Sequence, residues 1–552
     1  MTRWPVLALA ALAILAVLLR ASWAGAPGLS PPEASRALAG WQLAHGSVPG
    51  WWGAPALATG TALTFVFFGD NDTMARLLPA LCGAATVAAL VLLWRWVGWP
   101  GILTSAVLLA LSPSGIAAGR RVSEEAAAAL LTLLLGWMLV RSWDRRSTVV
   151  PGVMAIGFGL LLQLGHPGIA GCMALVLFLL AWSAVRPQRA APPLPIWISD
   201  YGLLFPLGAA FVLAGTGGLV YLNGFGFPAM AAWSDHFDIV AAQPEWYQAG
   251  LALVGFEPVA IAIGLPAAAL ALRRWPARPL DSGAAFSAFL ALWAVLSILL
   301  LLMSGTGDVG SVWMAALPLS LLAGSLAGAG FRALDSESVR QFAVALPLVC
   351  ACVVFGVLSA LHAAGDPTST GLWLGAAAIV MGASVAGAVS LGATRPSAVA
   401  VLFAGLFGLV AAFHGISRLG AGWPGEASGP AYLNQVVGEQ TLVSPYTVVG
   451  RGAHIDVETS LQNPMAWYLR GVPGVSYLSQ VRRGPTILIM DETRSPGELS
   501  GYRRVPLPIS ESWSMSGWAW QDAVRWLATG EVPQGARSSR RVTVYIGSQR
   551  GA

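Results

Sequence analysis

The sequence of 552 residues contains no lysine, so its 31 basic side chains are all arginines. Charged residues make up only 10% of the chain, whereas soluble domains carry about 25%. Hydrophobic residues make up 56% of the chain. These proportions exclude a soluble globular protein and indicate a polytopic α-helical membrane protein. The formal net charge of +5 reflects where the arginines lie, and no nucleic-acid partner is expected.

Cysteine is also scarce. The four cysteines, Cys82, Cys172, Cys350 and Cys352, all lie in apolar runs, so no structural disulfide is expected in the polar C-terminal region. The sequence has no Walker A motif, no dinucleotide-binding fingerprint and no Cys/His metal cluster. A nucleotide-driven pump is disfavoured on that ground. No organic cofactor is expected, and a divalent metal has no support in the sequence.

Apolar runs long enough to span a membrane recur along the first three quarters of the chain. They predict a transmembrane domain over residues 1–419 with about thirteen helices, and with outer loops at about 21–73 and 223–250. A shorter apolar piece, residues 54–69, follows Trp51 and Trp52 and predicts a helix that lies at the membrane interface. The predicted spans are residues 4–20, 74–95, 99–116, 124–142, 148–164, 168–185, 201–222, 251–272, 283–303, 309–330, 341–361, 371–391 and 397–416.

The arginines set the predicted orientation, because cytoplasmic loops carry an excess of basic residues. Arginines recur in alternate loops, which places the N-terminus in the cytoplasm and the C-terminal region outside the cell membrane. Arg36 and the pair Arg120 and Arg121 break this rule, since they fall in the first two outer loops. They are candidates for binding an anionic ligand. The alternative is that Arg120 and Arg121 only solvate a helix end or contact lipid headgroups.

From about residue 420 the composition becomes polar and rich in glycine. Short β-prone runs such as VSYL and PTILIMDE follow, and NPMAWYLRG predicts a helix with Asn463 as its cap and Pro464 at its first position. Alternating strands and helices predict an extracytoplasmic α/β domain over residues 420–552. We expect it to lie over the first two outer loops, with Trp467 in its own core and with Arg470 reaching toward the cavity or an acidic partner such as Asp456. The alternative is that Arg470 only solvates the C-terminus of its helix.

Several motifs resemble a known family. TMARLLPALCG (residues 73–83) is close to the stretch that opens the second span of the family-39, protein-mannosyltransferase-like group within the GT-C class of membrane glycosyltransferases. LLALSPSGIAAGRRVSEEAAAALLTLLL (residues 108–135) looks like the next motif of that group. NPMAWYLRGVPGVSYL (residues 463–478) is similar to a segment of its flippase-associated branch in archaea and bacteria. The resemblance runs over nearly the whole chain.

The resemblance implies an inverting transferase that moves a hexosyl or pentosyl group from a polyprenyl-phosphate-linked donor to an acceptor on the outer face, in cell-envelope or protein glycosylation. It implies membrane lipid and the polyprenyl-linked sugar as ligands, and other envelope glycosylation or flippase proteins as partners. A carboxylate can deprotonate an acceptor hydroxyl, and arginine binds a departing phosphate. The resemblance therefore implies that Glu33 is the catalytic carboxylate on a short loop, which acts as general base or orients the acceptor, and Glu33→Gln is expected to abolish transfer at little cost in stability. The expected substrate-binding residues are Arg36, Arg120, Arg121, Glu124, Glu125 and His166.

The chain departs from the family pattern in three places. Pro32 and Glu33 stand where the family has Asp-Glu, Glu125 replaces an aspartate, and Gly165 and His166 replace Lys-Glu. A second reading is therefore a catalytically inactive protein on the same scaffold that binds lipid-linked glycans or helps to translocate them. A third, a secondary transporter, is disfavoured because neither repeated halves nor polar residues inside the spans were recognised.

Overall fold

A computed structural model gives the fold of the protein. The structure describes residues 4–21, 29–47, 49, 53–144, 149–185, 204–216, 246–275, 281–304, 309–333, 454–470, 474–479, 487–495, 497, 499–513, 518–529 and 537–547. The predicted spans at 341–361, 371–391 and 397–416 lie outside these residues, as do most of the predicted loop at 223–250 and the predicted domain boundary near 420.

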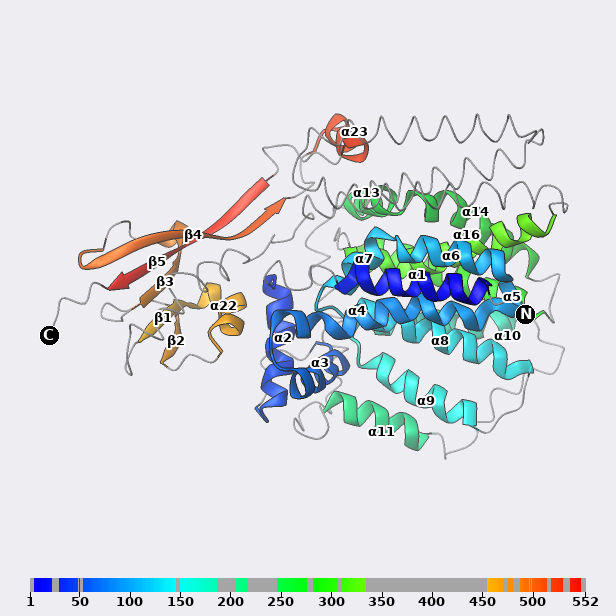
Figure 1. Ribbon diagram of the computed structural model, residues 1–552, viewed down its shortest axis with the longest axis horizontal. Coiled ribbons are helices and arrows are strands. Elements are labelled where there is room, and N and C mark those ends of the chain that lie inside the picture. Colours follow the sequence, from blue (N-terminus) through cyan, green and yellow to red (C-terminus); the bar gives the residue numbers. More distant parts are fainter. Residues whose placement is uncertain are drawn as a thin grey trace.

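Long apolar helices form a bundle whose axes run in one general direction (Figure 1). Among the described residues, six helices are long and apolar enough to cross a membrane, or up to eight if each of two bent helix pairs is one span. The multi-pass helical architecture expected from composition is therefore confirmed. The bundle contains α1 (Trp4–Ala21), α4 (Asp72–Ala89), η1 (Leu90–Leu93), α5 (Trp94–Val97), α6 (Trp99–Ala110), α7 (Pro113–Arg120), α8 (Glu125–Asp144), α9 (Val149–Leu162), α10 (Gly165–Val185), α11 (Leu204–Gly215), α13 (Trp246–Phe256), α14 (Pro258–Arg274), α15 (Ser282–Ser304) and α16 (Val309–Ala333).

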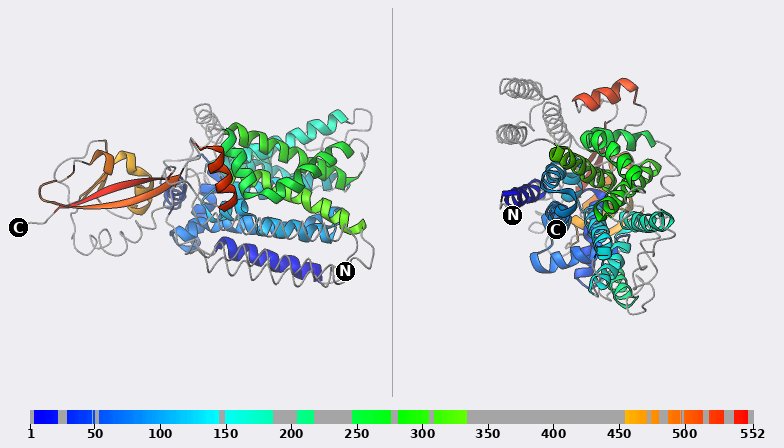
Figure 2. Two further views of the ribbon diagram at one scale, coloured as in Figure 1. Left: turned by 90° about the horizontal axis from the view of Figure 1, so that it is seen from above. Right: turned by 90° about the vertical axis from the view of Figure 1, so that its right-hand side faces the viewer.

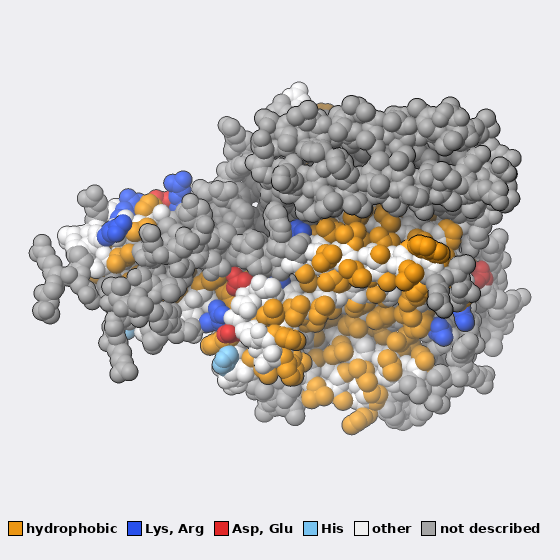
Figure 3. All heavy atoms as spheres, in the orientation of Figure 1, with side chains coloured by type: hydrophobic (Ala, Val, Ile, Leu, Met, Phe, Trp, Pro, Cys, Tyr) orange, Lys and Arg blue, Asp and Glu red, His pale blue; other side chains and the backbone are white. Residues whose placement is uncertain are grey.

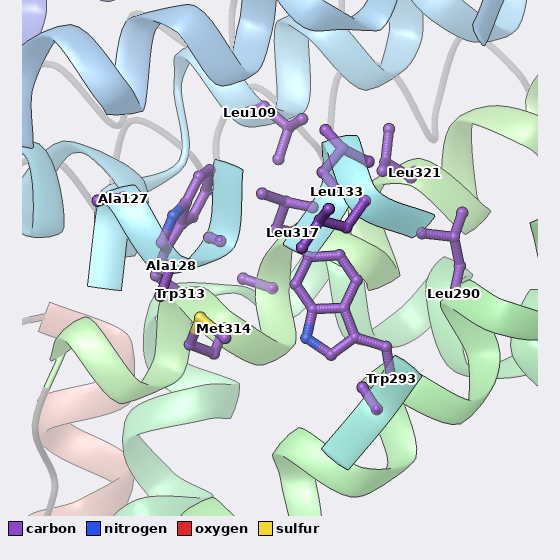
Figure 4. Close-up of a cluster of buried hydrophobic side chains, with 14 of the residues drawn as sticks. Leu109, Ala127, Ala128, Leu133, Leu290, Trp293, Trp313, Met314, Leu317 and Leu321 are labelled. Atoms are coloured by element: carbon purple, nitrogen blue, oxygen red, sulfur yellow. The ribbon is translucent and has the colours of Figure 1, made fainter. Parts of the chain in front are cut away.

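Small residues let some of these helices approach closely. A Cβ atom placed on Gly101 of α6 would lie 2.6 Å from the carbonyl oxygen of Gly324 in α16. Close packing of this kind replaces the hydrophobic effect as the main attraction between helices in lipid. Large side chains fill the remaining space, and Figure 4 shows Trp293 and Trp313 among leucines that include Leu133 and Leu317.

The flank of the bundle is apolar on the outside as well as in its core. Figure 3 shows hydrophobic side chains over much of this face of the helices, with charged side chains near its two ends. Ile14 of α1 is 60% exposed, and Phe67 and Phe68 of α3 (Pro55–Phe68) are 75% and 65% exposed. Exposed side chains of this size are expected where the surrounding solvent is hydrocarbon.

Two helices lie across one end of the bundle. One is α3, which forms where the interfacial helix is predicted, and the other is α2 (Pro31–Ala44), which occupies a region that the sequence analysis assigns to a loop (Figure 1). That prediction is wrong, because the residues around Glu33 form a helix start with Pro31 at its first position. Ser30 and Glu33 make a capping box, in which the Glu33 carboxylate accepts from the Ser30 backbone N–H at 3.0 Å.

The C-terminal residues form the predicted α/β domain. Its five strands lie in the order β2-β1-β3-β5-β4, with β1 parallel to β2 and β3, and with β5 antiparallel to β3 and β4. The predicted runs VSYL and PTILIMDE correspond to β2 and β3. The elements are β1 (Ile455–Glu458), η5 (Thr459–Leu461), α22 (Gln462–Tyr468), β2 (Val475–Leu478), β3 (Ile487–Asp491), η6 (Glu492–Arg494), β4 (Tyr502–Trp513), α23 (Trp520–Thr529) and β5 (Arg537–Gly547).

This domain lies beyond α2, at the end of the bundle opposite α5 (Figures 1 and 2). Its helix α22 packs against α2, and Trp526 of α23 packs on Phe256 of α13 with a ring-centroid distance of 5.6 Å. The sheet domain therefore joins the bundle through two separate helices.

Candidate functional site

The residues singled out from the sequence come together at the end of the bundle that carries the sheet domain. Glu33 and Arg36 come from α2, and Arg120, Arg121, Glu124 and Glu125 come from the end of α7 and the start of α8. His166 lies in the first turn of α10. These elements bring the residues into two neighbouring polar clusters, one around Glu33 and one around Glu124.

Glu33 is buried and fully engaged. Its Oε1 accepts from Arg76 Nε at 3.0 Å and from the Val122 N–H at 3.1 Å. Its Oε2 accepts from Arg76 Nη2 at 3.2 Å, from the Ser30 N–H at 3.0 Å and from Ser30 Oγ at 2.9 Å. A carboxylate offers about four lone-pair sites, and these five donors leave none free. Glu33 therefore fixes the start of α2 to α4 and to the segment before α8.

The charge around Glu33 has a clear electrostatic effect. Burial opposes ionisation, but the Arg76 guanidinium, its hydrogen bonds and the Ser30 N–H outweigh it and lower the pKa of Glu33 to about 2. The nearby charge of Arg121 acts in the same direction. A general base works best with a pKa near the working pH. Both the bonding and the pKa favour a structural role for Glu33 over the catalytic role expected from the sequence.

The second cluster centres on Glu124. Arg36 Nε lies 3.2 Å from Glu124 Oε2, and Arg36 Nη2 donates to Oε1 at 3.2 Å. His166 Nδ1 lies 3.8 Å from the same Oε1, an ion pair only when the imidazole is protonated. The Glu124 side chain is 4% exposed, whereas those of Arg36 and His166 are 20% and 23% exposed. This cluster is therefore open to solvent through its basic members.

Of the remaining predicted residues, Arg120 and Glu125 contact other helices, whereas Arg121 stays near Glu33. Arg120 donates from Nε to the carbonyl oxygen of Leu19 at the end of α1, at 2.9 Å. Glu125 is 2% exposed and packs on Gly310 of α16, where a Cβ would lie 2.6 Å from the Glu125 carboxyl carbon. Arg121 follows α7 in extended conformation and lies close enough to Glu33 to lower the pKa of that carboxyl. The structure therefore does not bring all the predicted site residues into a single cluster.

Helix α22 of the sheet domain closes over this end of the bundle. Trp467 Nε1 donates to Asp72 Oδ1 at 2.8 Å, and the Trp467 ring stacks on Phe65 with centroids 5.7 Å apart. The Tyr468 hydroxyl donates to Asp72 Oδ2 at 3.3 Å and accepts from the Leu29 N–H at 2.6 Å. Burial and the Asp72 charge raise the pKa of the Tyr468 phenol, which keeps it protonated as a donor.

Two expectations for α22 are corrected by these contacts. Trp467 packs with the bundle core and not with the core of its own domain. Arg470 does pair with an acid, as expected, but that acid is Asp70, with Nε 3.4 Å from Oδ2, and not Asp456. Both results follow from the closeness of α22 to the connection between α3 and α4, which the sequence alone does not reveal.

Three buried charged groups and the half-buried Asp72 matter here but are absent from the predicted site residues. Arg76 lies inside the quoted motif TMARLLPALCG, and Asp72 opens the same helix. Arg20 and Glu257 are 0% and 6% exposed and lie within predicted apolar spans, so polar residues inside the spans do occur. The signal for Glu257 was an acid before a proline in the otherwise apolar run GFEPVAIA. Among the described residues no group of three or more His, Cys, Asp or Glu side chains is placed to hold a metal ion.

A broken-helix bundle, two helices across its end and an α/β domain above them define a multi-pass membrane protein with the GT-C fold, as the sequence motifs indicated. Solved structures of ArnT from Cupriavidus metallidurans, one bound to undecaprenyl phosphate and one in the apo state, match the chain with a TM-score of 0.52 each. Each match covers 100% of this chain and 99% of ArnT at 16% sequence identity, a likeness that shows the fold. No model of a protein family matches the sequence, and no curated protein matches it either.

Proposed function

We propose that this protein is a membrane glycosyltransferase that takes its sugar from a polyprenyl-phosphate-linked donor and acts at the end of the bundle beneath the sheet domain. The observation that carries the proposal is the Arg36–Glu124–His166 cluster, which lies at that end and is partly open to solvent. The fold match to a protein crystallised with undecaprenyl phosphate supports the class of donor. The positive-inside count supports the assignment of this end to the outer face.

Each group in the cluster has a chemical task in this proposal. Arg36 offers a guanidinium that can turn from Glu124 to a lipid phosphate, since its side chain is 20% exposed. Glu124 has fewer donors than Glu33 and lies beside an imidazole, so we assign acid–base chemistry on the acceptor to Glu124. His166, 3.8 Å from Glu124, would hold or move the proton. Arg121 would add positive charge where the phosphate leaves.

A second function is favoured by one specific observation. The only first-loop acid in the family position, Glu33, is saturated by Arg76 and Ser30, and Pro32 replaces the family aspartate. A protein that binds lipid-linked glycans without transferring their sugar would need the arginines but not a free base. This reading predicts binding of the lipid without turnover.

Two measurements on the purified full-length protein separate these functions. The first is the shift in thermal unfolding temperature on adding undecaprenyl phosphate, which reports binding to the folded state. The second is transfer or hydrolysis of radiolabelled sugar from a polyprenyl-phosphate donor. A transferase gives both signals, and a non-catalytic binder gives only the first. Absence of any lipid-dependent shift would contradict both functions.

Variants connect these signals to the cluster. Arg36→Met should weaken the lipid-dependent shift, because it removes the guanidinium proposed to bind phosphate. Glu124→Gln should lower transfer by roughly 10²–10⁴-fold, the usual contribution of general acid–base catalysis, while the lipid still binds. Arg95→Met is the matched control for Arg36→Met, since Arg95 lies on α5 at the opposite end of the bundle (Figure 1).

A further inference from the structure

The span made of α6 and α7 is broken at a defined point. The two helices meet at a bend of 57° around Leu111 and Ser112. Pro113 has no N–H, so the carbonyl of Leu109 lacks the donor that a continuous helix would supply. Ser112, which precedes the proline, has an extended ψ of 119°. The break therefore leaves a helix C-terminus and a helix N-terminus inside the bundle, each in need of partners.

Arg20 of α1 occupies the C-terminal side of this break. Its Nη2 donates to the orphan carbonyl oxygen of Leu109 at 3.1 Å, and its Nη1 donates to the Ala16 carbonyl oxygen at 3.2 Å. The side chain is 0% exposed and runs through a slot made by two glycines. Cβ atoms on Gly83 of α4 and Gly119 of α7 would each lie 2.8 Å from it. A cation at the end of α6 is also favoured by the helix dipole.

Glu257 occupies the N-terminal side. Its Oε1 accepts from Ser112 Oγ at 2.5 Å, from Ser114 Oγ at 2.6 Å and from the Ser114 N–H at 3.1 Å. Glu257 itself stands at the 101° bend between α13 and α14, as the residue before Pro258. It does not cap its own helix, and its side chain caps α7 instead. One carboxylate thus joins the breaks of two bent spans.

The remaining donors of the first turn of α7 are also satisfied. The Gly115 N–H donates to Ser112 Oγ at 3.0 Å, and the Ile116 N–H donates to the Ser112 carbonyl oxygen at 2.9 Å. Within the described residues, neither Arg20 nor Glu257 forms a salt bridge with a charged side chain. Each of these buried side chains instead contacts the end of a half-helix that carries the opposite partial charge.

We propose that Arg20 and Glu257 are positioning residues that fix where α7 leaves the bundle, and so set the places of Arg120, Arg121 and Glu124. Helix α7 has only eight residues between the break and this segment, so a shift at Ser112 is transmitted to it directly. A second contact closes the arrangement, because Arg120 at the far end of α7 donates back to the Leu19 carbonyl oxygen of α1. The link to the donor lipid rests on the proposed function, whereas the link to the α7 geometry does not.

The test uses Glu257→Gln, which keeps the shape and one acceptor but removes the charge. Amide hydrogen exchange across residues 114–122 is measured without substrate, and the KM and kcat for the polyprenyl-phosphate donor are measured separately. Loss of a hydrogen bond to a charged group should raise exchange in this segment by about tenfold. Misplacement of the 120–124 segment should lower kcat/KM by roughly 10- to 100-fold, mainly through KM for the donor.

Matched variants keep the result interpretable. Thr86→Val removes a buried hydroxyl of α4 that bonds only within its own helix, to the Cys82 carbonyl oxygen, and should change neither readout. Arg20→Met should act like Glu257→Gln, and Arg20→Lys should restore much of the protection, since it keeps the cation. Ser114→Ala is a milder change at the same contact and serves if the charge variants do not fold.

The outcomes separate two failures. If Glu257→Gln and Ser114→Ala leave exchange over 114–122 no faster than in Thr86→Val, the positioning role is refuted, whatever the activity. If exchange rises but the wild-type protein neither binds nor uses the donor lipid, the positioning role stands and the proposed function fails. If exchange rises and the donor KM is unchanged, the proposed link between α7 and the lipid is overturned.

Discussion

Replacement of Glu33 by glutamine changes one oxygen of a buried carboxylate into an amide nitrogen. This change should lower the free energy of unfolding of the protein. An amide nitrogen in place of Oε2 would face three donors, the Ser30 N–H, Ser30 Oγ and Nη2 of Arg76, at positions now 2.9–3.2 Å from Oε2. Arg76 has a side chain only 4% exposed and would lose the counter-charge that compensates its burial. Breaking one side of a buried ion pair costs about 3–5 kcal/mol. This replaces the expectation from sequence that Glu33→Gln costs little stability.

The pKa of Glu33 predicts how this contribution to stability depends on pH. Burial raises this pKa, but the Arg76 guanidinium and its hydrogen bonds outweigh burial and lower the value to about 2 in the folded protein. Because the folded pKa is lowered, this stability is fully present at pH 7 and is lost as the pH falls from about 4.5 towards 2. The Glu33→Gln variant should lack this part of the acid dependence.

The assay is thermal or denaturant unfolding of the detergent-purified protein, in comparison with a surface pair of the same chemistry. Glu492→Gln is the control, because Glu492 and Arg504 are 3.4 Å apart with side chains 30% and 40% exposed. Exposed pairs contribute about 0–1 kcal/mol, so this variant should unfold like the wild type. Equal unfolding temperatures for Glu33→Gln and Glu492→Gln, combined with loss of transfer only in the former, would refute the structural role and restore Glu33 to the mechanism.

Other predictions concern the contacts of α22 with the bundle, the packing of Gly83 against Arg20 and the orientation of the protein in the membrane. Trp467→Ala should destabilise the protein by about 3–5 kcal/mol in unfolding assays, because it empties a buried site between α22 and Phe65. Loss of the partly exposed ion pair between Arg470 and Asp70 should cost about 1 kcal/mol or less. Equal losses of stability in the two variants would contradict this prediction. Gly83→Ala should cost about 1–3 kcal/mol, since its Cβ would lie 2.8 Å from the buried guanidinium of α1, and an unchanged unfolding temperature would exclude that contact. In a Cys-free background, Arg503→Cys should react with a membrane-impermeant thiol reagent in intact cells and Arg274→Cys only after permeabilisation; the reverse pattern would invert the proposed orientation.

The membrane helices were predictable because a helix that crosses the hydrocarbon core of a membrane needs a long apolar segment. Among the described residues, eight of the ten predicted spans up to residue 330 correspond to a helix or bent helix pair that is long and apolar enough to cross a membrane, and the other two, 148–164 and 201–222, correspond to the shorter helices α9 and α11. The strands β2 and β3 were found for a similar reason, since each is a short run of β-branched and apolar residues between turns. Helix α2 was not predicted. Two signals for it are present in the sequence, the Ser30-x-x-Glu33 capping box and a proline, Pro31, at the first helical position.

The site was predicted less well, for a physical reason. The sequence identified which loops carry charge, and the Arg36–Glu124–His166 cluster joins residues from three of them. It could not identify the partner of each charge, because Glu33 and Arg76 are 43 positions apart and meet only through the packing of α2 on α4. Arg36, which is nearer in sequence to Glu33, turns instead to Glu124. Pairing of this kind depends on helix rotation and crossing, which hydropathy does not encode.

The contacts of α22 have a consequence for biosynthesis. Asp72 and Trp467 are 395 positions apart, and Leu29 and Tyr468 are 439 positions apart. At about 5–20 residues per second, a ribosome needs roughly 20–80 s to make the chain between Asp72 and Trp467. During that interval α2 and the start of α4 are already synthesised, but the aromatic partners from the C-terminal domain do not yet exist. The end of the bundle that holds the Glu124 cluster is therefore completed last, and a nascent chain cannot acquire the finished site until its final domain has been synthesised and α22 has docked on that end.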